Sequence, residues 1–213
     1  MTTHEDLLDR LDETRERLLV AIEPLSDAAL LAPGAIGRWS IADLLSILTA
    51  WDAEVVTGLL RLKQGKTPDK LLDAVRNPDA YNAGRYQDAQ GRDLDVIFED
   101  FQGARLHLED WLGEFSAKAL ADPQHYKSLG GVALGRLIAQ ATYENEARYL
   151  PFLQSFAERW QPPAAMDQEI ITLAGIDVLD IGLAPDSGQS NGDTPWGHEP
   201  GDDEDEDDPR NLA

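Results

Sequence analysis

The fold of this chain is decided by residues 38–55, which read RWSIADLLSILTAWDAEV. Ser40 is a good N-cap, because its hydroxyl can accept a hydrogen bond from a free N–H of the first helical turn, and Asp43 can complete a capping box. The apolar side chains that follow recur at helical spacing on one face, with Ile47 beside them: Leu44, Leu48, Trp51 and Val55. The stretch therefore predicts an amphipathic helix that continues to about Gln64.

Three more amphipathic segments accompany this helix, and together they predict an all-α fold. The first helix covers residues 3–23, the third covers residues 93–115, and the fourth covers residues 132–160 with a kink at Pro151. Residues 26–31 add a short helical turn after the first helix.

A long connection, residues 66–92, separates the second helix from the third. We expect a short helix at residues 69–76 and a turn at Asn77 and Pro78. A connection of this length inside a compact domain usually packs over the core or carries function. Its polar side chains are therefore candidates for the mouth of a pocket: Asn82, Arg85 and Tyr86. The alternative is a packed crossover without a binding role.

The composition limits the partners of the chain. Its 213 residues carry a formal charge of −22 and include no cysteine, which excludes disulfides and thiolate metal sites. This negative charge should repel nucleic-acid phosphates and anionic lipids. No apolar run approaches the ~18 residues needed to cross a bilayer, and no signal-peptide core is present. We therefore expect a cytoplasmic protein that binds neither nucleic acid nor membrane.

Two parts are expected along the chain: a helical bundle over residues 1–162 and an acidic, low-complexity tail over residues 163–213. From residue 161 onward there are 14 acidic residues and one basic residue, Arg210. The acidic run at residues 202–208 cannot bury enough apolar area to offset its chain entropy, so we expect the tail to be mostly disordered.

Two motifs resemble helices of the DinB-like four-helix bundle superfamily. The second helix of that family is similar to residues 39–51, with the pattern W-S-x-x-D-L-L-x-x-L-x-x-W, and its last helix to residues 141–152, which read ATYENEARYLPF. The ClbS/DfsB branch is similar to residues 43–51, D-L-x-S-x-L-x-x-W, and to residues 134–138, L-G-R-x-I. The resemblance implies an up-down-down-up bundle with a long crossover between helices two and three.

The metal-binding members of this superfamily carry histidine at three positions, one on the second helix and two on the last. Here these positions are Ile47, Asn145 and Tyr149. Isoleucine cannot bind a metal, and a neutral amide and a phenol are poor ligands for zinc or nickel. The resemblance therefore implies a degenerate metal site with neither metal nor other cofactor.

The side chains that remain at the degenerate site are polar. Either Asn145 and Tyr149 bond to each other and to nearby backbone, or they line a small-molecule pocket. Arg148 is expected to pair with Glu144 on the same helix. The residues that we assign to this pocket come from two helices and two connections: Trp39, Ile47, Trp51, Asn82, Arg85, Tyr86, Asn145, Arg148 and Tyr149.

The resemblance implies a protective protein that binds or hydrolyses a small reactive compound. Whether the chain is an enzyme is left open, because it lacks a nucleophile motif, and Glu54 and Glu146 would serve as general bases only if desolvated. The alternative is a non-catalytic interaction or stress-response module that acts through its surface and acidic tail. A homodimer and a basic protein partner, docked on the tail through apolar residues 170–183, also remain open.

Overall fold

The structure is a computed structural model that describes residues 4–161, and these residues form helices and loops without a β-strand. The elements in chain order are α1 His4–Ile22, α2 Asp27–Leu31, α3 Ile41–Lys63, α4 Asp69–Arg76, α5 Pro78–Asp88, α6 Leu94–Leu112, α7 Ala117–Ala121, the 3₁₀ turn η1 Lys127–Leu129, α8 Leu134–Ala141, α9 Tyr143–Ala147 and α10 Leu150–Arg159. The predicted all-α class is confirmed. The predicted tail, its apolar and acidic segments and the boundary at residue 162 lie outside the described residues.

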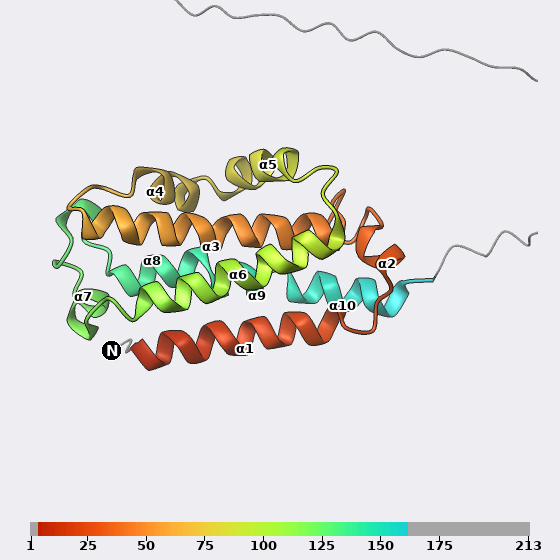
Figure 1. The fold of residues 1–213 in the computed structure, drawn as a ribbon, viewed down its shortest axis with the longest axis horizontal. Coiled ribbons are helices and arrows are strands. Elements are labelled where there is room, and N and C mark those ends of the chain that lie inside the picture. Colours follow the sequence, from red (N-terminus) through yellow and green to blue (C-terminus); the bar gives the residue numbers. More distant parts are fainter. Residues whose placement is uncertain (1–3, 162–213) are drawn as a thin grey trace, which may run out of the picture. The chain divides into compact units, whose positions relative to one another are not determined.

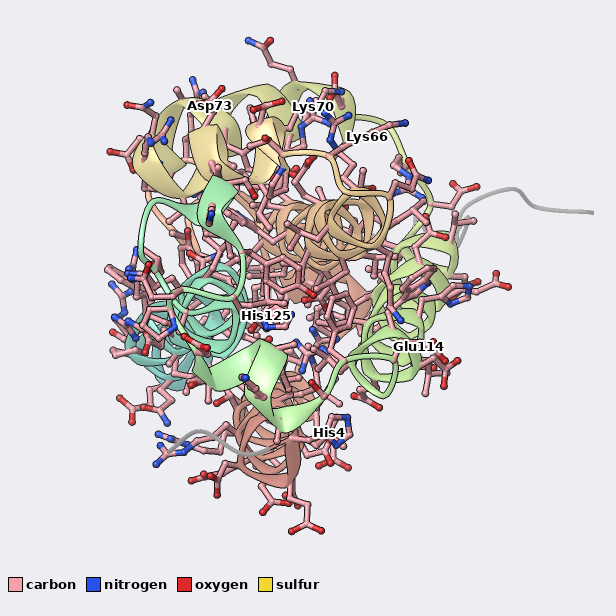
Figure 2. All side chains as sticks on the ribbon, turned by 90° about the vertical axis from the view of Figure 1, so that its left-hand side faces the viewer. His4, Lys66, Lys70, Asp73, Glu114 and His125 are labelled. Carbon is pink, nitrogen blue, oxygen red and sulfur yellow. The ribbon has the colours of Figure 1, made fainter. Side chains whose placement is uncertain are left out.

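Four rods build the bundle: α1, α3, α6 and the consecutive helices α8, α9 and α10. Figure 1 shows that α1 and the last rod run in one direction while α3 and α6 run in the other, which confirms the up-down-down-up order. Figure 2 looks along the rods from the end where α1 begins and α3 has just finished, marked by His4 and Lys66.

The start of α3 forms as its sequence predicts. The Ser40 hydroxyl accepts a hydrogen bond from the Asp43 N–H at 3.0 Å, and the Asp43 carboxylate accepts one from the Ser40 N–H at 2.8 Å. In the loop before it, the backbones of Ile36 and Trp39 bond to each other in both directions. Gly37 takes φ 62°, a left-handed conformation that favours glycine. This turn holds Trp39 beside the first residue of the helix.

The crossover contains one helix more than predicted. The short helix α4 is confirmed, but residues 78–88 form α5, where only a turn was expected. Pro78 lies in the first turn of α5, where its missing N–H costs no intrahelical bond and its fixed φ suits the helix. The crossover helices α4 and α5 pack along α3, and the Tyr81 hydroxyl of α5 donates to the Ala50 carbonyl of α3 at 2.9 Å.

The fourth rod breaks twice, whereas the sequence predicts one helix kinked at Pro151. The first break is Thr142, with φ −114° and ψ −105°, whose hydroxyl donates at 2.7 Å to the Ile138 carbonyl, which also accepts from the Thr142 N–H at 2.9 Å. At the second break, Pro151 has no N–H for the carbonyl of Ala147, where α9 ends. The five-residue helix α9 is thereby set apart from its neighbours.

The apolar core falls into two clusters along the bundle. One surrounds Ile47 and Trp51 and extends to Leu7 of α1, and the other surrounds Leu18 and Phe101. Three of the rods carry a buried charged residue within the apolar face. Arg15 lies between Leu11 and Leu18 on α1, and Arg105 lies between Phe101 and Leu108 on α6. On the last rod, Glu146 lies between Ala141 and Leu150.

Candidate functional site

A chain of hydrogen bonds joins three of the predicted site residues. The indole Nε1–H of Trp51 donates to Oδ1 of Asn82 at 2.8 Å, and Nδ2 of Asn82 donates to the hydroxyl of Tyr149 at 3.1 Å. Because an indole N–H can only donate, the orientation of the Asn82 amide is fixed. The Tyr149 oxygen therefore accepts from Asn82, and the Tyr149 O–H hydrogen is left to donate elsewhere.

The surroundings of Tyr149 keep it a neutral donor. Burial raises the pKa of its phenol above the ordinary value of 10.0, although the Asn82 hydrogen bond and the charge of Arg148 act in the opposite direction. At neutral pH the phenol is therefore protonated. It can donate a hydrogen bond to a ligand, but it is not a phenolate nucleophile.

Asn145 of α9 is buried with an unused donor. Only 2% of the residue is exposed, and its Nδ2 has no hydrogen-bond partner within residues 4–161. Of the two alternatives left open by the sequence, the bond between Asn145 and Tyr149 is not formed, and Tyr149 accepts from Asn82. A buried amide donor without a partner costs about 1–3 kcal/mol, which makes it a rare feature that requires an explanation.

Trp39, Tyr86, Arg85 and Arg148, which were also predicted to line the pocket, do not take part in this hydrogen-bond chain. Trp39 stacks on Tyr86 with ring centroids 6.2 Å apart. Arg85 is exposed, pairs with Asp88 at 3.2 Å and lies over the Tyr81 ring, with Cζ 5.4 Å from the centroid. Arg148 is exposed as well, and the pairing expected for it is not made.

Glu144 was the partner expected for Arg148, but its carboxylate instead forms an ion pair with Arg136 of α8. Five hollows in the described surface are lined by residues other than Trp39, Asn145 and Tyr149. A ligand therefore reaches the Asn145 amide only after neighbouring side chains move aside.

The three positions that carry histidine in metal-binding relatives do not fit a metal ion here. Ile47 has no exposed surface and belongs to an apolar cluster, and Tyr149 is engaged by Asn82. Across the part of the chain that the structure describes, no three histidine, aspartate or glutamate side chains group as ligands would. Ile47, Asn145 and Tyr149 offer an alkyl group, a neutral amide and a hydrogen-bonded phenol, which do not make a ligand set for zinc or nickel.

A buried charge cluster, which the sequence interpretation missed, lies beside this site. Its four members are Arg15 of α1, Asp52 of α3, Arg105 of α6 and Glu146 of α9, one from each rod, and each is less than a tenth exposed. Arg15 donates to Glu146 at 2.9 Å and to Asp52 at 3.0 Å. Arg105 donates to the same two carboxylates at 2.8 Å and 3.1 Å.

The two positive and two negative charges of the cluster compensate one another. Burial alone would lower the pKa of Arg105, but Asp52 and Glu146 outweigh it, so the pKa lies above its usual value. The remaining guanidinium donors reach backbone carbonyls, that of Phe101 from Arg15 at 3.1 Å and that of Leu11 from Arg105 at 2.9 Å. Because both oxygens of Glu146 accept from arginine, this carboxylate is not available as the general base considered from the sequence.

A signal for the cluster does exist in the sequence. Arg15 lies at helical spacing between Leu11 and Leu18, and Arg105 lies likewise between Phe101 and Leu108. A charged residue inside an otherwise apolar stripe indicates a buried ion pair. The cluster adjoins the polar site directly, since Asp52 follows Trp51 and Glu146 follows Asn145.

Comparison with known proteins identifies the family. The profile of the DinB superfamily matches residues 10–149, more than half of the chain, and the chain belongs to this superfamily. No curated protein sequence matches it. Among solved structures, the colibactin self-resistance protein ClbS, crystallised in complex with double-stranded DNA, is similar with a TM-score of 0.62 and 16% identity, over 76% of this chain and 99% of ClbS.

An uncharacterised protein from Escherichia coli UTI89 is similar as well, with a TM-score of 0.59 and 17% identity, over 74% of this chain and 94% of that protein. At these identities, the two neighbours support the fold and not a shared activity. The part of each neighbour that matches this chain is almost its whole length.

The ClbS structure corrects one expectation from the composition. A protein of this fold has been solved with double-stranded DNA, so the exclusion of nucleic acid is wrong. The exclusion rested on the charge summed over the whole chain, and a sum does not describe the local surface that would meet a phosphate. For membranes, none of the described helices is both long and apolar enough to span a bilayer.

Proposed function

We propose that this chain is a cytoplasmic, metal-independent protective protein that binds a small reactive compound at the Asn145–Tyr149 site. One observation carries the proposal: the Asn145 amide is buried with its Nδ2 unpaired. A fold retains such a costly donor more readily when a ligand oxygen satisfies it. The ligand class is therefore a compound with a carbonyl or similar acceptor oxygen.

The hydrogen-bond chain from Trp51 through Asn82 supports a second contact to the ligand. It fixes the Tyr149 oxygen as an acceptor, so that the phenol proton is directed away from Asn82. An amide N–H and a phenol O–H can together polarise an acceptor oxygen. Binding is the primary role that we propose, since Glu146 is held by two arginines and no other general base lies among these residues.

The likeness to ClbS is consistent with a protective role, since that protein is described as a self-resistance protein. The second candidate is a non-catalytic interaction or stress-response module, which would leave Asn145 without a ligand. The two candidates differ in what a substitution at Asn145 does to small-molecule binding.

The test is a thermal-shift screen of reactive carbonyl and other electrophilic compounds against the full chain, with a double-stranded DNA oligomer in the same screen. A binding protein shows a rise in Tm that is lost in Asn145→Leu and reduced in Tyr149→Phe. Asn77→Leu is the matched control, because Asn77 is exposed and makes no side-chain cap bond. Shifts that persist in Asn145→Leu would refute the site.

A further inference from the structure

A hollow in the described surface lies between α1, the α1–α2 connection, α2 and α6, and neither Asn145 nor Tyr149 lines it. Its volume is about 680 Å³, which is in the range of small-molecule sites. Its apolar lining includes residues from all four of these elements: Leu19, Val20, Leu25, Leu30 and Phe98. Val20 is 60% exposed, so the fold leaves apolar surface in contact with solvent at this point.

The charged residues around this hollow are acidic. Asp12 and Glu16 of α1 and Glu23 of the α1–α2 connection line it, and none of the three forms an ion pair with another residue of the range 4–161. The one cation in the lining is Arg15, whose guanidinium is already bound to Glu146 and Asp52. The hollow therefore combines an apolar wall with uncompensated negative charge.

The other arginines of α1 do not neutralise this surface. Arg10 and Arg17 line a different hollow, together with Tyr143 of the last rod. The negative charge around the hollow also acts on Glu109 of α6. Burial raises the pKa of the Glu109 carboxyl, and the charge of Asp12 raises it further.

We propose that this hollow binds an amphipathic organic cation, a compound with a hydrocarbon body and an ammonium group. Leu19, Leu25 and Leu30 would remove the hydrocarbon from water. The carboxylates of Glu16 and Glu23 attract the ammonium, and the Phe98 ring adds a cation–π partner. An anionic amphiphile meets repulsion from the same carboxylates, and a neutral one gains only the apolar contact.

Isothermal titration of the full chain with octyltrimethylammonium tests the proposal, with octyl glucoside and octyl sulfate as matched neutral and anionic probes below their micelle concentrations. We expect the cation to bind most tightly and to weaken as salt rises, because salt screens exposed charges. The double variant Glu16→Gln/Glu23→Gln should bind the cation roughly two- to tenfold more weakly, as expected for two exposed ion pairs.

Two controls separate this site from general charge effects. Glu5→Gln/Glu13→Gln removes the same charge from exposed positions of α1 that do not line the hollow, and should leave binding unchanged. Val20→Lys places a cation at an exposed position of the hollow and should weaken binding without unfolding the protein, checked by circular dichroism. Equal binding of octyl glucoside, equal loss in both double variants, or no binding of octyltrimethylammonium would each overturn the proposal.

Discussion

The carboxylate of Glu146 lies between two buried guanidinium groups, 2.9 Å from Nε of Arg15 and 2.8 Å from Nη2 of Arg105. Glu146 belongs to the short helix α9, which is broken from α8 at Thr142 and ends at Ala147. The two ion pairs add to the packing of this short helix on α1 and link it to α6. Because Asn145 is the preceding residue, the same contacts fix the position of the unpaired amide.

Removing the charge of Glu146 should destabilise the bundle strongly. In Glu146→Gln, Arg15 and Arg105 share the single remaining carboxylate of Asp52, and breaking a buried ion pair costs about 3–5 kcal/mol. Urea unfolding of the full chain measures the loss. Glu144→Gln is the control, since its ion pair with Arg136 is partly solvent-exposed and should matter by less than about 1 kcal/mol. Equal losses of stability in the two variants would contradict the assignment of Glu146 to a buried, charge-compensated cluster.

Asn82 should be a structural bridge whose loss is felt on both sides. In Asn82→Leu the buried Trp51 indole N–H loses its acceptor and the Tyr149 hydroxyl loses its donor, which we expect to cost about 1–3 kcal/mol in urea unfolding. Tyr149→Phe keeps the Trp51 bond and should cost less. If Tyr149→Phe proves the more harmful of the two, the bond between Trp51 and Asn82 contributes little.

Alkaline pH should weaken the fold through Tyr149. Its pKa is raised above 10.0 in the folded state, so above that pH the unfolded chain loses a proton that the folded chain keeps. The stabilisation is complete below pH 10 and is lost as pH rises through the folded pKa. Burial also raises the pKa of Tyr81, Tyr126 and Tyr143, so tyrosinate absorbance should show several late-titrating phenols, one fewer in Tyr149→Phe. If Tyr149→Phe instead loses a phenol that titrates at the ordinary value, the assignment is contradicted.

Elemental analysis of the purified chain without a polyhistidine tag should find no stoichiometric zinc or nickel. The reason is the chemistry of Ile47, Asn145 and Tyr149, which offer an alkyl group, a neutral amide and a hydrogen-bonded phenol. A metal that remains at one equivalent after dialysis would show that other residues of the chain bind it.

The sequence predicted the four rods because long amphipathic patterns determine helices with little help from distant contacts. It missed α5, since a proline that favours a turn equally favours the first turn of a helix. The first break of the last rod depends on the backbone conformation at Thr142, which no sequence pattern predicts.

At the candidate site, the motif positions led to Asn145 and Tyr149, but their partners could not be predicted. The bond from Asn82 to Tyr149 spans 67 residues, and that from Arg15 to Glu146 spans 131. Whether a polar side chain is paired or left alone in the core is decided by these distant neighbours.

The role of Asn145 is tested most directly by comparing Asn145→Leu with Asn82→Leu in urea unfolding without ligand. The same substitution removes an unpaired amide at one position and an amide bonded on both sides at the other. We predict that Asn145→Leu is as stable as the parent or more stable, since it relieves a buried donor without a partner, while Asn82→Leu loses about 1–3 kcal/mol. If Asn145→Leu loses as much as Asn82→Leu with an unchanged m-value, the Asn145 amide is a structural element of the core and not a donor held for a ligand.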